Sequence, residues 1–283
     1  MQQRYFIPGD QWLYYKLYTG NMSADKILLQ NLQALIEKLF QEKIIDQWFF
    51  IRYNDPEFHL RIRFHLIDNQ QEINNVIRQM FENLKDLVNQ KIIWKVQIDT
   101  YKRELERYQL SRYEKTEAIF TADSFMFLEL LPYIFGSEQA TQRWLIALKK
   151  IDGFLDIVFN KKLDAKLNFI KTMADNFAGE FKMDKTLRKQ INEKFKANFE
   201  AIHSILNNQF DPPEILQIID KYHRQMAKIL QDEQLNHQTT GGFVHMMMNR
   251  MFPSENRKQE LVIYQFLFLY YRRLMAQQKH LKR

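Results

Sequence analysis

One stretch of the chain, Phe58–Leu66, constrains the fold most, because apolar and basic side chains alternate along it without interruption. The apolar positions are Phe58, Leu60, Ile62, Phe64 and Leu66, and the positions between them are His59, Arg61, Arg63 and His65. Successive side chains of a strand point to opposite faces, so the stretch predicts one apolar and one basic face. Basic neighbours repeat about every 6.6 Å, which suits two carboxylates or one dianion. The alternative is a half-exposed strand with a solvated polar face.

Composition narrows the chemistry that the chain can carry. Its 283 residues, 46% of them hydrophobic, can bury a sizeable core, and the absence of cysteine excludes disulfides, cysteine nucleophiles and thiolate metal sites. The sequence has no two histidines four residues apart with a glutamate, which would suggest a zinc site, and it has no glycine-rich phosphate loop. We therefore expect neither metal nor cofactor. The net charge of +7 favours acidic partners. However, the basic residues are scattered along helical segments, and we expect no direct nucleic-acid binding.

Two segments bear on localisation. The N-terminal residues lack the apolar core of a signal peptide. The longest apolar run, Leu261–Tyr271, is interrupted by Gln265. It falls short of the roughly 20 apolar residues that a membrane span needs, so we expect a buried helix and a cytoplasmic protein. The sequence leaves open whether the chain forms a homodimer.

The first hundred residues predict alternating strands and helices. Aromatic or β-branched stretches indicate strands at 12–18, 45–53, 58–66 and 92–98, and helical spacing indicates helices at 23–41 and 68–88. This β-α-β-β-α-β order predicts a ferredoxin-like antiparallel sheet with both helices on one face. The first and third strands are then central, and the third carries the basic face.

From residue 114 onwards the pattern is almost entirely helical. Apolar residues at helical spacing predict helices near 123–135, 138–159, 164–181, 184–206, 213–231, 240–252 and 257–280. We therefore predict an α+β protein with a sheet subdomain, 1–113, and a helical subdomain, 114–283, in one compact domain. The helical half is expected to pack against the sheet, whose basic face is open.

Two small clusters outside the basic strand are candidates for chemistry. Glu104 and Arg107 are three residues apart and share a face of a helical turn, although a surface ion pair explains them equally well. His245 and Asn249 share a helical face after Gly241-Gly242. A lone histidine among apolar residues is commonly a satisfied core residue, which is the alternative here.

These patches, taken in order, resemble the C-terminal domain of class I lantibiotic dehydratases, which also occurs free-standing as the thiopeptide-type bacteriocin biosynthesis protein family. The resemblance runs from about Trp12 to Tyr271. The matching segments are Trp12 with Lys16-Leu17-Tyr18, Phe50–Pro56, His59–Arg63, Tyr101-x-x-Glu104-x-x-Arg107-Tyr108, Glu117–Phe120 with Asp123-Ser124, and His245-Met246-x-x-Asn249-Arg250.

The resemblance implies a glutamate-eliminating lyase. In that family a larger domain esterifies Ser or Thr of a precursor peptide with glutamate from glutamyl-tRNA, and the C-terminal domain expels glutamate to leave dehydroalanine or dehydrobutyrine. The implied partners are the precursor peptide, a separate glutamylation protein and a lanthionine cyclase. The family's catalytic residues fall on Arg61, Arg63, Glu104, Arg107 and His245. For substrate binding we add His59, Arg103, Asn249 and Arg250.

One departure and two alternatives remain. The family often has two glycines after Arg107-Tyr108, where this chain has Gln109-Leu110, so the loop geometry there is expected to differ. A relative with the same fold forms the pyridine of thiopeptides by a formal [4+2] cycloaddition. The other alternative is a non-catalytic, peptide-binding subunit.

Overall fold

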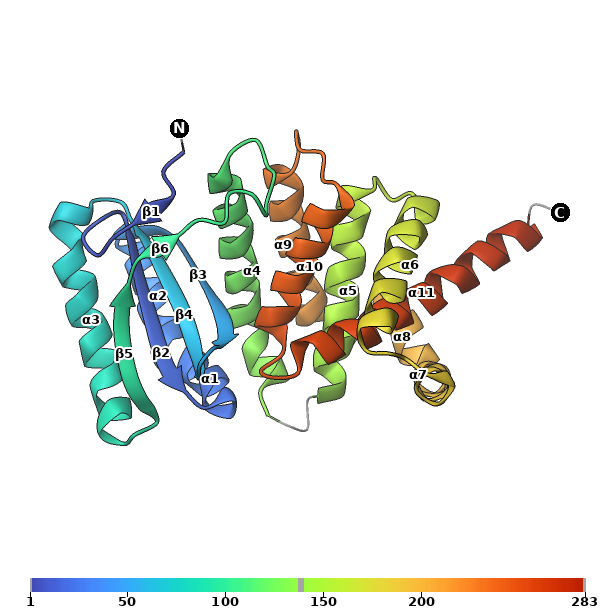
Figure 1. Ribbon diagram of the computed structural model, residues 1–283, viewed down its shortest axis with the longest axis horizontal. Coiled ribbons are helices and arrows are strands. Elements are labelled where there is room, and N and C mark those ends of the chain that lie inside the picture. Colours follow the sequence, from blue (N-terminus) through green and yellow to red (C-terminus); the bar gives the residue numbers. More distant parts are fainter. Residues whose placement is uncertain (1, 137–139, 282–283) are drawn as a thin grey trace. The chain divides into compact units, whose positions relative to one another are not determined.

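The computed structural model describes residues 2–136 and 140–281, which form an α+β fold (Figure 1). The chain divides into two compact units, Met1–Phe135 and Gly136–Arg283, and each is described by itself. The division follows helix α4, Tyr113–Ile134, rather than preceding it as the change of pattern at residue 114 suggested. The physical reason is that α4 packs against the sheet of the first unit.

The first unit contains a four-stranded antiparallel sheet. Its strands are β2 (Trp12–Thr19), β3 (Ile45–Asn54), β4 (Phe58–Leu66) and β5 (Ile93–Asp99), in the order β3-β4-β2-β5. The alternating stretch is β4, which together with β2 occupies the centre of the sheet. Each strand lies within a residue or two of its expected bounds.

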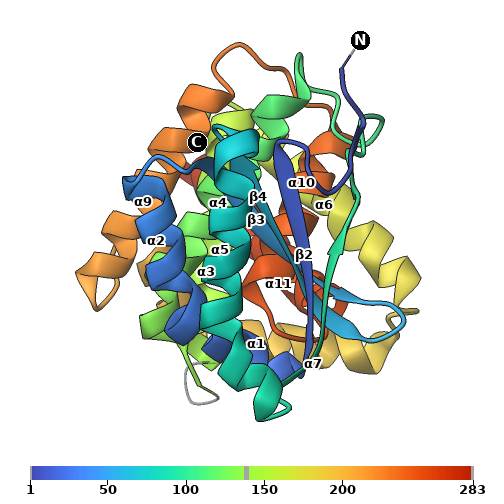
Figure 2. The ribbon, with the colours of Figure 1, turned by 90° about the vertical axis from the view of Figure 1, so that its left-hand side faces the viewer.

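Helices cover the apolar face of this sheet. They are α1 (Asn21–Ile27), which continues through a π-helical turn (Leu28–Leu32) into α2 (Gln33–Gln41), and α3 (Asn69–Asn89). Figure 2 shows α2 and α3 side by side over the sheet. Asp68 caps α3 by accepting hydrogen bonds from the amides of Gln70 and Gln71. Beneath the helices, the apolar side chains of β4 from Leu60 to Leu66 are fully buried.

Helix α4 packs along the edge strand β3 through aromatic rings. The ring centroids of Phe50 and Phe127 are 5.3 Å apart, and those of Trp48 and Phe125 are 5.6 Å apart. The backbone amide of Phe50 also donates to the hydroxyl of Ser124 at 3.3 Å. This edge of the sheet is therefore covered by a helix.

A second, two-stranded sheet was not expected from the sequence. Strand β1 (Tyr5–Phe6) pairs antiparallel with β6 (Tyr101–Lys102) directly after the long strand β5. The pairing ties the N-terminal residues to the segment that connects β5 with α4. It also fixes Tyr101, whose ring stacks on that of Phe6 with centroids 5.8 Å apart.

The regular elements of the second unit, within its described residues, are all helices. Its helices are α5 (Ala140–Val158), α6 (Leu163–Glu180), α7 (Lys185–Ala197), α8 (Phe199–Leu206), α9 (Pro213–Ile229), α10 (His237–Met251) and α11 (Asn256–Leu281). Helix α11 contacts α5, α6, α7 and α10, and α5 contacts α8, α9 and α10. Across residues 2–136 and 140–281, no helix has the length and apolar character that crossing a membrane requires.

Three expected helix boundaries in this unit were wrong or lie partly outside the described residues. The helix expected over 184–206 is two helices, α7 and α8, which meet at Asn198. Helix α10 begins at His237, capped by Asn236, so Gly241-Gly242 lie inside the helix and do not start it. Residues 138–139 of the helix expected to begin at 138 lie outside the described residues.

Candidate functional site: a basic sheet face and a histidine–glutamate pair

The basic residues of β4 face a row of aromatic and cationic side chains on β2. Tyr14 is the register partner of Arg63, Lys16 of Arg61, and Tyr18 of His59. Residues that pair across two antiparallel strands lie on the same face of the sheet. The basic face therefore contains Lys16 and two tyrosines in addition to the four residues of β4.

Arg63 is buried at the centre of this face, with 7% of its surface exposed. Its guanidinium carbon lies 4.4 Å from the ring centroid of Tyr14, 5.0 Å from that of Phe49 and 4.8 Å from that of Tyr101. No carboxylate pairs with it, and its Nε and Nη1 atoms have no hydrogen-bond partner among the described residues. Cation–π contacts offset only part of the cost of burying a charge, so this guanidinium is suited to an anion.

The hydroxyl of Tyr14 adds an unpaired donor beside Arg63. Tyr14 is buried, and its hydroxyl has no partner within the described part of the chain. Burial raises the pKa of Tyr14, although Arg63, Arg61 and Lys16 oppose the rise. The phenol therefore stays protonated at neutral pH and can donate a hydrogen bond.

Arg61 is held by two neighbours. Its guanidinium carbon stacks 3.4 Å from the ring centroid of Tyr53, and its Nε donates to His59 Nε2 at 3.1 Å. His59 Nδ1 in turn donates to the carbonyl oxygen of Glu57 at 2.8 Å. Burial lowers the pKa of His59, so the imidazole is a neutral acceptor that orients Arg61. The two terminal nitrogens of Arg61 have no partner among the described residues and are available to a ligand.

Lys16 is the third cation of the row that contains Arg61 and Arg63. It forms an ion pair with Asp99 on the neighbouring strand β5. The hydrogen bond from Lys16 lowers the pKa of Asp99, so that carboxylate stays ionised and holds the ammonium. Tyr14 and Lys16 were not singled out as candidates. The signal that could have identified them is the alternation of Trp12, Tyr14, Lys16 and Tyr18, which becomes informative once the strand order is known.

Arg103, a candidate for substrate binding, has partners within the protein. Its Nε and Nη2 donate to the two carboxylate oxygens of Glu117 at 2.8 and 2.5 Å, and its Nη1 donates to Glu114 and to the carbonyl oxygen of Gln3. Glu117 also accepts a hydrogen bond from the hydroxyl of Tyr101 at 2.9 Å. This buried network holds Tyr101 against Arg63.

Glu104 and Arg107 form the expected ion pair, at 3.0 Å, in the segment between β6 and α4. Both side chains are exposed, with 58% and 41% of their surface accessible. Isolated exposed pairs contribute little to stability, so this pair is free to exchange partners. The hydroxyl of Tyr113 accepts a hydrogen bond from the amide of Glu104 at 3.1 Å and fixes the backbone there.

The second unit holds His245 through a buried carboxylate. His245 Nδ1 donates to Glu260 Oε1 at 2.6 Å, from α10 to α11, and Glu260 is 1% exposed. Arg257 Nη1 lies 3.5 Å from the other oxygen of Glu260, and Arg257 also pairs with Glu180. His245 Nε2 has no partner among the described residues, so this nitrogen is available to a substrate. Sequence reasoning missed Glu260, because no spacing pattern links residues on different helices.

The remaining candidates in the second unit are placed differently. Arg250 is fully buried, and its Nη1 donates to the carbonyl oxygen of Met246 at 3.2 Å. Asn249 is half-buried, and its carbonyl oxygen accepts from Asn256 at 3.3 Å. Arg61, Arg63, Glu104 and Arg107 thus belong to the first unit and His245, Asn249 and Arg250 to the second. Among the described residues, no group of three His, Asp or Glu side chains is placed to hold a metal ion.

Two of these features indicate what chemistry the side chains can carry. A buried guanidinium without a counter-ion, beside protonated phenols, is typical of a site for anionic groups. A histidine held by a buried carboxylate, with its second nitrogen free, is typical of proton transfer. The first feature belongs to the first unit and the second feature to the second unit.

Comparison with known proteins identifies the family. The family described as lantibiotic biosynthesis dehydratase C-terminal matches residues 12–271, and the chain belongs to it. The nisin biosynthesis protein NisB of Lactococcus lactis subsp. lactis is 26% identical over 93% of the chain. That match covers 26% of NisB, so the chain spans about a quarter of the length of this relative.

Solved structures share the fold. The tRNA-dependent lantibiotic dehydratase MibB of Microbispora sp. 107891 matches 92% of this chain with a TM-score of 0.72 and 18% identity, over 28% of its own length. The pyridine synthase TbtD from thiomuracin biosynthesis matches 93% of this chain with a TM-score of 0.61 and 11% identity, over 98% of its own length. At these identities the likeness establishes the fold alone.

Proposed function

We propose that the chain eliminates glutamate from glutamylated Ser or Thr residues of a ribosomally made precursor peptide. Family membership supports this assignment, and the observation that carries it is the buried, unpaired guanidinium of Arg63. The reaction removes the α-proton, breaks the bond between Cβ and the ester oxygen, and forms the Cα–Cβ double bond of a dehydroamino acid. The bonding electrons leave with glutamate as a carboxylate.

The arginines act on charge that develops during the reaction. Loss of the α-proton places negative charge on the neighbouring carbonyl oxygen, and the leaving group is itself an anion. Arg61 and Arg63 hold the glutamyl group, and Tyr14 donates a hydrogen bond beside Arg63. Fixed donors aimed at developing charge are worth about 3 kcal/mol each in enzymes that stabilise oxyanions. Arg107 assists from its exposed pair with Glu104, which orients it.

His245 transfers the proton through its free Nε2. The hydrogen bond to Glu260 fixes the proton on Nδ1, so that Nε2 presents a lone pair to the substrate. Glu260 also stabilises the imidazolium that forms when the proton is taken up, as the carboxylate of a catalytic triad does. Among the binding candidates, His59 positions Arg61 and Arg103 positions Tyr101, whereas Asn249 and Arg250 support the helix that carries His245.

The reaction also implies its neighbours. A glutamylation activity supplies the esterified peptide, and a lanthionine cyclase is the class of enzyme that consumes its product. We further propose that the β-α-β-β-α-β segment is ferredoxin-like, which the central positions of β2 and β4 support.

The test is mass spectrometry of a chemically glutamylated precursor peptide incubated with the wild type, Arg63→Ala, His245→Ala or His65→Gln. We expect the wild type and His65→Gln to release glutamate and leave a dehydrated peptide. His65 is a matched control because it lies on the same face of β4 but pairs with Asp46 at 2.6 Å. Arg63→Ala and His245→Ala should slow elimination at least 100-fold.

Three other outcomes would reject the proposal. Full activity of both alanine variants would remove Arg63 and His245 from the mechanism. Release of glutamate with restoration of Ser or Thr would indicate ester hydrolysis. Inertness toward the glutamylated peptide, combined with cyclisation of a peptide that holds two dehydroalanines, would indicate a pyridine synthase instead.

A further inference from the structure

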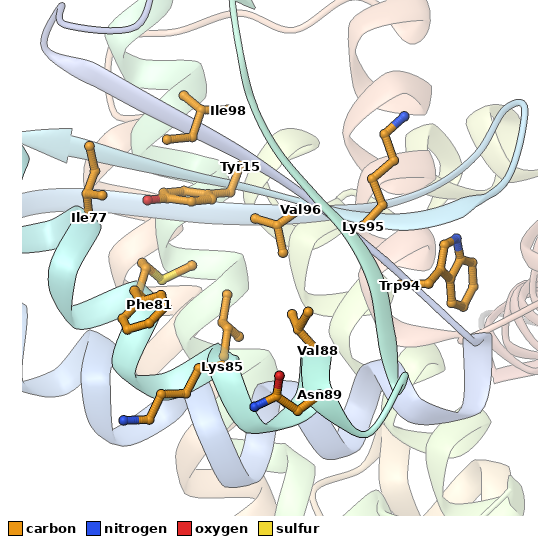
Figure 3. Close-up of a pocket in the computed structure, with 12 residues that line it drawn as sticks. Tyr15, Ile77, Phe81, Lys85, Val88, Asn89, Trp94, Lys95, Val96 and Ile98 are labelled. Atoms are coloured by element: carbon orange, nitrogen blue, oxygen red, sulfur yellow. The ribbon is translucent and has the colours of Figure 1, made fainter.

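An apolar groove lies on the first unit between α3 and β5. Its volume is about 870 Å³, and Figure 3 shows Phe81 and Val88 of α3 across from Val96 and Ile98 of β5. Phe81 is 60% exposed and Trp94, at one end, is 49% exposed. A cluster of exposed apolar side chains in one concavity is typical of a binding surface.

The floor of the groove is an edge strand. Strand β5 is the outermost strand beside β2, so one side of its backbone has no strand partner among the described residues. Edge strands of this kind accept an additional strand from another chain. Val96 and Ile98 occupy alternate positions about 6.6 Å apart, which is the side-chain repeat of an extended peptide, whereas Trp94 lies where the register of β5 against β2 shifts.

The charges at the groove specify its occupant. The two charged residues among its lining side chains, Lys85 and Lys95, are both cations. Lys85 pairs with Glu82 at 2.6 Å. Lys95 has no ion-pair partner among the described residues and lies 4.9 Å from the ring centroid of Tyr18. Its register partner is Tyr18, so its side chain points to the basic face of the sheet, opposite Val96 and Ile98. An extended peptide added beside β5 can therefore place alternate apolar side chains in the groove and a carboxylate between them on the opposite face, beside Lys95.

A second copy of the chain matches less well. Pairing of two β5 strands would offer Lys95 no free acid. Asp99, the acidic residue of β5, is already paired with Lys16.

We propose that this groove binds an unmodified segment of the precursor peptide as an added strand beside β5, with apolar side chains in the groove and an acidic residue at Lys95. The inference rests on the proposed function for the identity of the peptide. Docking a remote segment raises the local concentration of each glutamylated residue at the catalytic groups. It explains how one enzyme would process several residues of one peptide without reading the sequence around each.

The test compares two glutamylated substrates: the full-length precursor, and a short peptide with one glutamylated Ser and two flanking residues on each side. We expect Val96→Glu and Ile98→Glu to raise KM for the full-length substrate about tenfold, because each places an acid in the apolar groove. For the short peptide, kcat/KM should stay unchanged. Ile67→Glu is the matched control, since Ile67 is 50% exposed but does not line the groove.

A charge exchange makes the test sharper. Lys95→Glu should weaken binding of the full-length precursor, measured by fluorescence anisotropy of a labelled peptide. A precursor whose acidic residues outside the modified region are replaced by lysine should recover affinity for this variant. Because anisotropy needs no turnover, a failure of the elimination assay would overturn the proposed function and leave the docking result interpretable.

Two results would overturn the groove proposal. One is an unchanged KM and affinity for the full-length precursor in both groove variants. The other is a wild-type dimer, seen by native mass spectrometry, that Val96→Glu converts to a monomer without affecting peptide binding, since the groove would then be an interface between copies.

Discussion

Arg63 illustrates how a single residue acquires a role from its surroundings. Its charge is buried among three aromatic rings, and no carboxylate of the described residues pairs with it. Arg103, two residues after Tyr101, pairs with both Glu117 and Glu114. A buried arginine whose donors are occupied by carboxylates has little capacity for another anion, whereas an unpaired one retains that capacity. We therefore expect the two guanidiniums to have different roles because their partners differ, although the two groups are chemically the same.

Replacing Tyr14 by Phe tests the donor beside Arg63. The ring that contacts Arg63 is retained, but the buried hydroxyl is lost, and we expect kcat for elimination to fall about 100-fold because one donor to the developing anion is removed. Tyr18→Phe is the control, since Tyr18 lies on the same strand and face and stacks on His59. Equal losses in the two variants would show that the effect is not specific to the Arg63 site.

Replacing Glu260 by Gln tests the support of His245. The substitution removes the negative charge that holds Nδ1–H, and we expect kcat to fall about 10- to 100-fold while KM changes little. Glu180→Gln is the control, because it removes the other carboxylate bound to Arg257 and leaves the hydrogen bond between His245 and Glu260 intact. A wild-type rate for Glu260→Gln would assign Glu260 to packing alone.

At the scale of secondary-structure elements, close approach of helices depends on single small residues. Gly153 of α5 lies against the imidazole of His223 on α9, and a Cβ at position 153 would collide with that ring. His223 Nε2 donates to the carbonyl oxygen of Lys150 at 2.9 Å, which holds the ring in place. The glycine costs helix stability but permits this contact between α5 and α9.

Gly153→Ala should therefore destabilise the protein by about 1–3 kcal/mol, measured as the free energy of unfolding in urea, because the collision with His223 outweighs the better helix propensity of alanine. In a His223→Ala background the same substitution should stabilise by up to about 1 kcal/mol, since only the propensity term remains. Destabilisation of equal size in both backgrounds would contradict the assigned collision.

At the scale of the whole molecule, the buried His59 and the half-buried His223 make stability depend on pH. Burial lowers the pKa of His59 in the first unit and of His223 in the second below the ordinary value of 6.5. The unfolded chain then binds more protons than the folded chain at and below that value, so the free energy of unfolding falls as the pH falls.

We expect the urea midpoint to be constant near pH 8 and to decline below about pH 6.5, with each histidine contributing up to about 1.4 kcal/mol per pH unit. His223→Gln should flatten this dependence without adding a charge. His203→Gln serves as the control, because His203 lies at the exposed side of α8, where its Nδ1 bonds the hydroxyl of Tyr270. A slope that His223→Gln leaves unchanged would contradict the role of burial.

Local patterns in the sequence determined much of the fold. Strict alternation in β4, the aromatic run of β2 and the helical spacing of α3 each specify an element through the side chains that it buries, so their bounds were predicted to within a residue or two. The break between α7 and α8 and the small β1–β6 sheet have no comparable periodic signal. They arise from contacts between segments far apart in the sequence.

For the candidate site, the sequence by itself determined that Arg61 and Arg63 share a face, because the period of a strand fixes it. Only the tertiary structure decided which cations remain unpaired, since this depends on partners from other elements: Glu117 for Arg103, His59 for the Nε of Arg61, and Glu260 for His245. Tyr14 joined the site through strand register, which no local pattern fixes. Side-chain direction is a property of one segment, but charge compensation is a property of the assembled fold.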